Sequence, residues 1–223
     1  MIAIETLIDR IRTLAHDTAE TGYTDEDILF NINAGIRFIS RIIKDMKPEL
    51  LMDFPATGQL NPGENTICVN NVMLAVLAVR ANGRALKVTS PLQIPDMRET
   101  AENPTAYYLC GFDKLALYPI PTKPVDYAVF YVPDTEEVTL TDKSPFPNDF
   151  DDALVEYAII RLSMGNEFDM SQELTVMQTV MQQVQELINN FPSPEHRIRG
   201  YWDDNDYTNS YGGRDDYGIR GYY

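Results

Sequence analysis

The chain has 223 residues, of which 44% are hydrophobic and 23% charged, a composition that supports one globular core with an appended or inserted subdomain. Its 34 acidic residues against 18 basic ones give a formal net charge of -16. Because nucleic-acid binders place clustered Lys and Arg against the phosphates, this balance excludes gripping DNA as the main function, although an acidic wall tolerates DNA that slides past it.

Two features indicate a protein of a reducing cytoplasm. Glu5, Asp9 and Arg10 break the apolar run at the N-terminus, so this run is neither a signal peptide nor a membrane span. Cys68 and Cys110 each lie in an apolar stretch, and two cysteines give no metal-binding spacing. We therefore expect both thiols to be buried and reduced rather than joined in a disulfide.

Two helices are predicted at the N-terminal end. Residues 3–16 carry an apolar stripe at helical spacing. The second helix is predicted to begin after Thr24, whose hydroxyl can cap it, and to end before Pro48. Three acidic residues follow Thr24 and favour the positive end of the helix dipole. Apolar positions widen the stripe of this helix, so we expect it to bury more than one face.

The middle of the chain is predicted to be rich in β-strands. Gly, Pro and Asn punctuate residues 55–71, and short runs of β-branched and aromatic residues follow. The strand candidates are residues 66–69, 73–81, 84–88, 107–110, 114–118 and 127–132. Asn82 and Gly83 indicate a type I′ hairpin, because both central residues of that turn need a positive φ. Residues 111–113 are predicted to turn a second hairpin.

Two more helices are predicted after residue 147. Asn148 or Asp149 is expected to cap the first of them, with two acidic residues in its first turn. One side of this helix is predicted to be formed by Leu154, Tyr157, Ala158, Arg161 and Leu162. The last helix is predicted to start at residue 169 or 171 and to end before Pro192.

These elements predict an α+β fold. Strands lie between two pairs of helices, and neither pair alone can bury its apolar stripes, so both pairs should form one small bundle. The expected parts are N-terminal helices (1–50), an inserted antiparallel β-rich subdomain (51–145), C-terminal helices (146–191) and an extended arm (192–223). After Pro194 the arm has six Tyr, one Trp, five Asp and five Gly but hardly any aliphatic residue. We expect it to order only when it binds a partner.

The arm contains a repeat that we interpret as its partner-binding site. The two copies are Ile198, Arg199, Gly200, Tyr201, Trp202 and Ile219, Arg220, Gly221, Tyr222, Tyr223. Aromatic residues and Arg anchor protein interfaces, and Gly lets the backbone approach a partner closely.

The sequence offers little for catalysis, and we expect neither an enzyme nor a metal or cofactor site. His16 and His196 are the only histidines, and the glycines of the arm open no phosphate-binding loop. The carboxylates that could form a metal or acid-base site are Asp149, Asp151, Asp152 and Glu156. Electrostatics at a helix start explains these four better. The run beginning at Asp203 has Thr208 and Arg214 where a calcium loop needs Gly and Glu.

Several segments, in their order along the chain, resemble the head-to-tail adaptor (head completion) proteins of tailed phages. The segments are LIDRIR (7–12), YTDEDIL (23–29), NINAGIR (31–37), YP (118–119), YAVFYVP (127–133) and FPNDFDDALVEYA (146–158), the last followed by Arg161. The resemblance covers residues 1 to about 191. It resides in the order of these segments, since each one alone is common.

The resemblance implies a structural protein of the virion neck, made in the host bacterial cytoplasm. Such adaptors form a dodecameric ring between the portal protein and the tail nozzle or tail-tube protein, and DNA passes through the lumen without specific binding. Members often dock on the portal with a C-terminal extension. Their family has no catalytic motif, so no catalytic residues carry over. The long, repeated arm of this chain departs from the family, so its docking mode cannot be transferred.

Two other classes of protein compete with this interpretation. A carboxylate-dependent hydrolase would have two close carboxylates with shifted pKa values in a deep pocket. An acidic DNA mimic or inhibitor would carry its charges along one continuous face at phosphate spacing. The acidic residues of this chain are spread along its whole length, which argues against mimicry. A gene position beside portal and capsid genes would decide the class.

Overall fold

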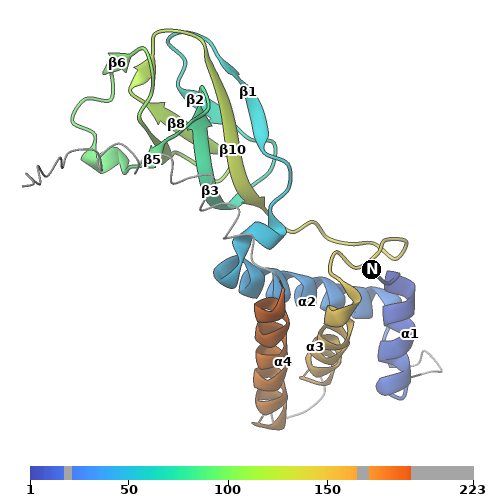
Figure 1. The fold of residues 1–223 in the computed structure, drawn as a ribbon. Coiled ribbons are helices and arrows are strands. Elements are labelled where there is room, and N and C mark those ends of the chain that lie inside the picture. Colours follow the sequence, from blue (N-terminus) through green and yellow to red (C-terminus); the bar gives the residue numbers. More distant parts are fainter. Residues whose placement is uncertain (18–21, 165–170, 192–223) are drawn as a thin grey trace, which may run out of the picture. The chain divides into compact units, whose positions relative to one another are not determined.

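A computed structural model describes residues 1–17, 22–164 and 171–191 of the protein, and Figure 1 shows how their elements are arranged. Two helices, α1 (Ile4–Leu14) and α2 (Asp25–Met46), precede a β-rich region. Two more, α3 (Asp151–Met164) and α4 (Ser171–Asn190), follow it. The predicted α+β fold, with helices at both ends and strands between them, is confirmed.

The second helix begins where the sequence predicts, at a cap formed by Thr24. Thr24 Oγ1 accepts a hydrogen bond from the backbone N–H of Asp27 at 3.1 Å, and the Asp27 carboxylate accepts one from the N–H of Thr24 at 3.1 Å. This pair satisfies N–H groups that a first helical turn leaves without partners. The hydrogen bonds from Thr24 also lower the pKa of Asp27, because they favour its charged form.

As predicted, α2 buries more than one of its faces. Besides its isoleucines it buries Asn33, whose amide donates to the Val138 carbonyl at 3.0 Å and whose Oδ1 accepts from the Val138 N–H at 2.8 Å. Gly35 is needed for close packing. A Cβ at this position would lie 3.1 Å from Tyr157 and 3.3 Å from Leu154, so glycine lets α2 and α3 approach.

The start of α3 and its packed side differ from the prediction. A 3-10 turn (Asn148–Phe150) precedes the helix, its N-cap is Pro147, and no side chain caps it, so the predicted Asn148 or Asp149 cap is wrong. Arg161, placed on the same side as Leu154 and Leu162 in the sequence, is exposed, whereas those two are buried. The buried apolar residues of α3 are Ala153, Leu154, Val155, Tyr157, Ala158, Ile160 and Leu162. They lie on most sides of the helix, because α3 contacts α1, α2 and α4.

Apolar side chains of all four helices form one core, which confirms the predicted bundle. Its members include Leu7, Ile11, Ile32, Ile36, Ile39, Leu154, Ala158, Val180, Val184 and Ile188. Lys47, directly after α2, closes the end of α4. Its Nζ donates to the carbonyls of Ile188 at 2.9 Å, Asn189 at 3.2 Å and Phe191 at 2.8 Å. The last carbonyl groups of a helix have no N–H donors within the helix, so Lys47 supplies the missing hydrogen bonds.

The β-rich region has its own core, which shares no residue with the helical one. Within the described residues the strands are β1 (Ala56–Leu60), β2 (Thr66–Cys68), β3 (Met73–Ala81), β4 (Arg84–Ala85), β5 (Lys87–Val88), β6 (Thr100–Ala101), β7 (Ala106–Leu109), β8 (Lys114–Tyr118), β9 (Ile120–Pro121) and β10 (Val125–Pro133). They form two four-stranded sheets, in the orders β1-β10-β3-β4 and β2-β8-β7-β5, and the pair β6-β9.

Most predicted strands are found, and the first hairpin is confirmed by positive φ at Asn82 (49°) and Gly83 (79°). The run 84–88 is two strands rather than one, because β4 pairs with β3 whereas β5 pairs with β7 of the other sheet. The pairs β5-β7 and β6-β9 are parallel, in contrast to the antiparallel pairing predicted for the region. Strand β1 was not predicted, because its sequence ATGQL contains polar residues and a glycine rather than a run of β-branched residues.

The two cysteines correct a prediction, because both are exposed rather than buried. Alternation along the strands explains their position. Ile67 and Leu115 fill the core, so the neighbouring Cys68 and Lys114, which face each other across β2 and β8, turn outward. Cys110 lies on the other side of β8, where its N–H donates to the Lys114 carbonyl at 3.1 Å.

Candidate functional site

The predicted partner-binding residues lie outside the part of the chain that the structure describes. This holds for both copies of the repeat, residues 198–202 and 219–223. His196 also lies outside the described residues, whereas His16 is exposed just after α1.

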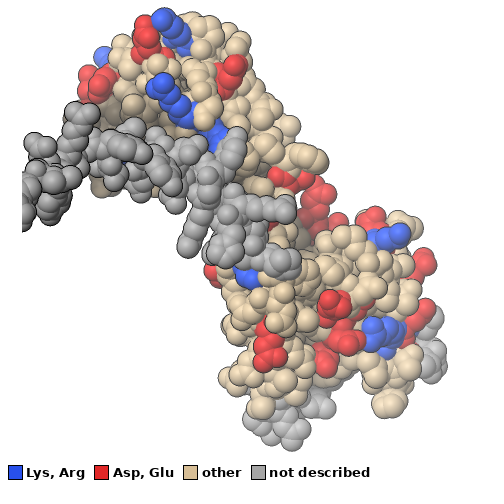
Figure 2. All heavy atoms as spheres, in the orientation of Figure 1, with Lys and Arg blue, Asp and Glu red and all other residues tan. Residues whose placement is uncertain are grey.

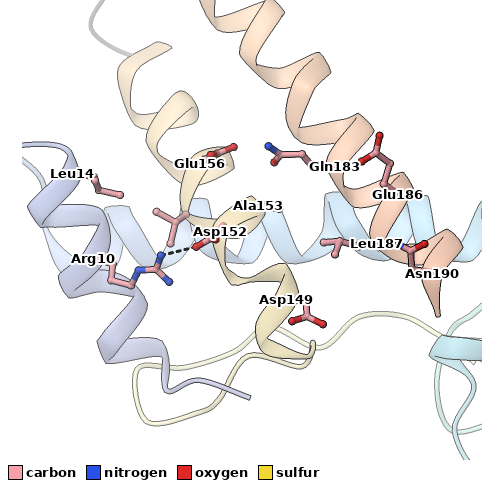
Figure 3. Close-up of a pocket in the computed structure, with 11 residues that line it drawn as sticks. Arg10, Leu14, Asp149, Asp152, Ala153, Glu156, Gln183, Glu186, Leu187 and Asn190 are labelled. Carbon is pink, nitrogen blue, oxygen red and sulfur yellow. Dashed lines mark hydrogen bonds and ion pairs between the residues drawn. The ribbon is translucent and has the colours of Figure 1, made fainter.

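A groove on the helical part brings together some of the carboxylates singled out in the sequence (Figure 3). It has a volume of about 390 Å³ and lies between α1, α3 and α4. Its polar and charged lining residues are Arg10, Asp149, Asp152, Glu156, Gln183, Glu186 and Asn190. Leu14 and Leu187 contribute apolar surface. We call this surface the acidic groove.

One ion pair crosses the acidic groove and leaves most of its negative charge uncompensated. Arg10 Nη2 lies 2.6 Å from Asp152 Oδ1, joining α1 to α3. Within the described part of the chain, Asp149, Glu156 and Glu186 form no ion pair. The electrostatic potential between these three helices is therefore negative, which favours binding of a positively charged partner surface.

Asp151, the fourth of the carboxylates at the start of α3, is not part of the groove. Its side chain is buried, and its Oδ1 has no hydrogen-bond partner among the described residues. Burial raises the pKa of Asp151, since it penalises the charged form. The N-terminal ammonium and Arg10 oppose this rise, while Asp152 and Asp149 add to the elevation of the pKa.

Replacing Asp151 by Asn is expected to change how stability depends on pH. A carboxyl whose pKa is raised in the folded state binds its proton more tightly there than in the unfolded chain. Its contribution to stability is therefore present below about pH 3.9 and is lost as the pH rises through the folded pKa. Urea unfolding of both proteins between about pH 3 and pH 7 should show the variant gaining stability relative to the parent as pH increases. A stability difference independent of pH would contradict this explanation.

Within residues 1–17, 22–164 and 171–191, no group of three or more His, Cys, Asp or Glu is placed to hold a metal ion. The Arg10 and Glu186 contributions to the groove could not be read from the sequence, because α1 and α4 meet α3 only in the folded bundle.

On the face drawn in Figure 2, acidic side chains are scattered rather than gathered along one continuous band, unlike a DNA mimic.

Comparison with known families decides what kind of protein this is. A family model described as SU10 adaptor protein matches residues 3–206. The chain belongs to the SU10 adaptor protein family. This is a family of phage head-to-tail adaptors, so the resemblance seen in the sequence is confirmed.

As an SU10 adaptor protein, the molecule is a component of the phage virion that interacts with portal and tail components. The family is structural. A search of curated proteins found no match. None of the described helices is both long enough and apolar enough to cross a membrane. The match to the family extends past α4 into the arm and includes residues 198–202, whereas residues 219–223 lie beyond it.

Proposed function

We propose that the protein forms a closed dodecameric ring between the portal protein and the tail nozzle or tail-tube protein. The ring continues the DNA channel without binding DNA specifically, and the protein is structural rather than catalytic. It is made in the host bacterial cytoplasm and incorporated into the virion neck. The observation that carries this proposal is the adaptor family match over residues 3–206. The net charge of -16 supports passage of DNA without specific binding, because an acidic protein does not hold a polyanion.

The arm, residues 192–223, is the proposed docking element for the portal. Each Ile-Arg-Gly-Tyr-aromatic copy offers a guanidinium that can pair with a carboxylate in a fork and two aromatic rings that can bury area. Lys47 fixes the carbonyls of the last turn of α4, so the arm starts from a defined point on the helical part.

The isolated protein is expected to be monomeric or weakly associated and to form a ring only on the portal. Self-repulsion from the net charge opposes a ring before the portal supplies contacts. Light scattering at moderate salt, on the protein alone and with purified portal, measures both states. Stable rings without portal would contradict assembly on the portal. Failure to bind either portal or tail proteins would contradict the proposed function.

A further inference from the structure

Helix α2 carries a row of cations on a strongly acidic protein. Arg37, Arg41 and Lys44 follow one another at helical spacing and line one small hollow, of about 160 Å³. We call this surface the basic stripe. Like charges three and four residues apart repel each other along a helix, so the stripe destabilises α2 unless anions lie nearby.

The anions of the same molecule compensate the basic stripe only in part. Arg37 pairs with Glu137 at 2.7 Å and Lys44 with Asp45 at 3.1 Å, and both acidic partners are exposed. Asp134 also lines the hollow. Arg41 is exposed and has no ion pair within the described part of the chain. Its guanidinium therefore remains available for a partner.

The partner that fits the basic stripe best is a second copy of the chain. Each copy has the acidic groove, where Asp149, Glu156 and Glu186 lack cations, and the groove shares no residue with the basic stripe. Two different, complementary patches on one molecule make a head-to-tail contact, which closes into a ring when the rotation between copies allows it. Duplex DNA fits less well, because the rest of the acidic molecule repels phosphates.

We propose that the basic stripe on α2 of one copy docks against the acidic groove between α1, α3 and α4 of the next copy. Arg41 is its central cation, and Glu156 and Glu186 are its acceptors. This contact deepens the proposed function, since it rests on the ring and names the two faces that meet in it. Electrostatic complementarity of this kind fixes which surfaces meet and penalises like charges placed opposite each other.

Reversal of charge on each face tests the contact. Arg41→Glu places an anion against the acidic groove, and Glu186→Arg places a cation against the basic stripe. Each single variant is expected to lower the yield of complete rings on purified portal about tenfold or more. The double variant Arg41→Glu/Glu186→Arg restores opposite charges and should recover ring formation. Arg84→Glu, an exposed reversal on β4 with the same change in net charge as Arg41→Glu, serves as the control and should assemble like the parent.

The outcomes separate this contact from the ring itself. If the parent forms no ring on the portal, the proposed function fails. Should the parent assemble and both single variants assemble equally well, the contact between stripe and groove is wrong. The same conclusion follows if the single variants fail and the double variant does not recover. Circular dichroism of each variant checks folding, and Arg41→Gln, which removes the cation without adding an anion, should give an intermediate yield.

Discussion

Replacing Arg12 by Leu is expected to lower the free energy of unfolding by about 3–5 kcal/mol, because it leaves a buried carboxylate without its cation. The side chains of Arg12 and Asp17 are each only 8% exposed, and Arg12 Nη1 lies 3.3 Å from Asp17 Oδ2. The guanidinium also donates to the Tyr23 carbonyl at 3.0 Å and to Asp25 Oδ1 at 2.5 Å. One side chain thus joins the end of α1 to the start of α2.

Arg10 provides a matched control on the same helix. Its ion pair with Asp152 is exposed, at 42% and 77%, so Arg10→Leu should cost only about 0–1 kcal/mol. Urea unfolding of the parent and both variants at neutral pH compares the two effects. Equal losses from the two substitutions would show that burial of the Arg12 network does not set its strength.

Removal of either repeat copy from the arm is expected to reduce attachment to portal-containing heads strongly while the helical part stays folded. The copies start 21 residues apart, a span of at most roughly 70 Å when extended, enough to reach a neighbouring subunit. Two linked contacts gain from their high effective concentration, so losing one should weaken binding by more than its own contacts suggest. Replacing Tyr201 and Trp202 by Ala should have the larger effect, because the family match includes that copy.

Co-sedimentation with DNA-filled heads measures attachment, and circular dichroism of the free protein reports folding. The variants are Tyr201→Ala with Trp202→Ala, and a deletion of residues 219–223. Replacing Tyr207 and Tyr211 by Ala removes two aromatic rings between the copies and serves as the control. If the repeat variants attach as well as this control, the repeat is not the anchor and the rest of the chain carries the portal contact.

The Thr24 cap and the first hairpin, which depend on neighbours in sequence, could be predicted, whereas the directions of strands that pair across the β-rich region could not. The Thr24 cap needs only the residues up to Asp27, and the Asn82 turn needs only its own backbone. By contrast, the parallel pairs β5-β7 and β6-β9 join runs whose order along the chain does not indicate their direction in a sheet. Cys68 was placed inside because its apolar neighbours suggested burial, whereas strand alternation turns it outward.

The candidate site was predictable only in part for the same reason. The acidic start of α3 is visible in the sequence, and three of its four carboxylates, Asp149, Asp152 and Glu156, line the groove. Asp151 belongs to the same run but turns into the interior, where burial changes its pKa. Arg10 and Glu186 complete the acidic groove from helices far away along the chain. No pattern in the sequence predicts that these residues of α1 and α4 lie next to the start of α3.

The pairing of β1 with β10 brings the two ends of the β-rich region together. These are its first and last strands, and Ala56 lies opposite Val129 while Leu60 lies opposite Val125. The chain therefore leaves and returns at neighbouring points, and everything between them closes on itself around a separate core. We expect that such a segment can change in length or be replaced while the helices keep their packing. For protein engineering, the two strand ends offer a natural place to graft a foreign domain onto the adaptor.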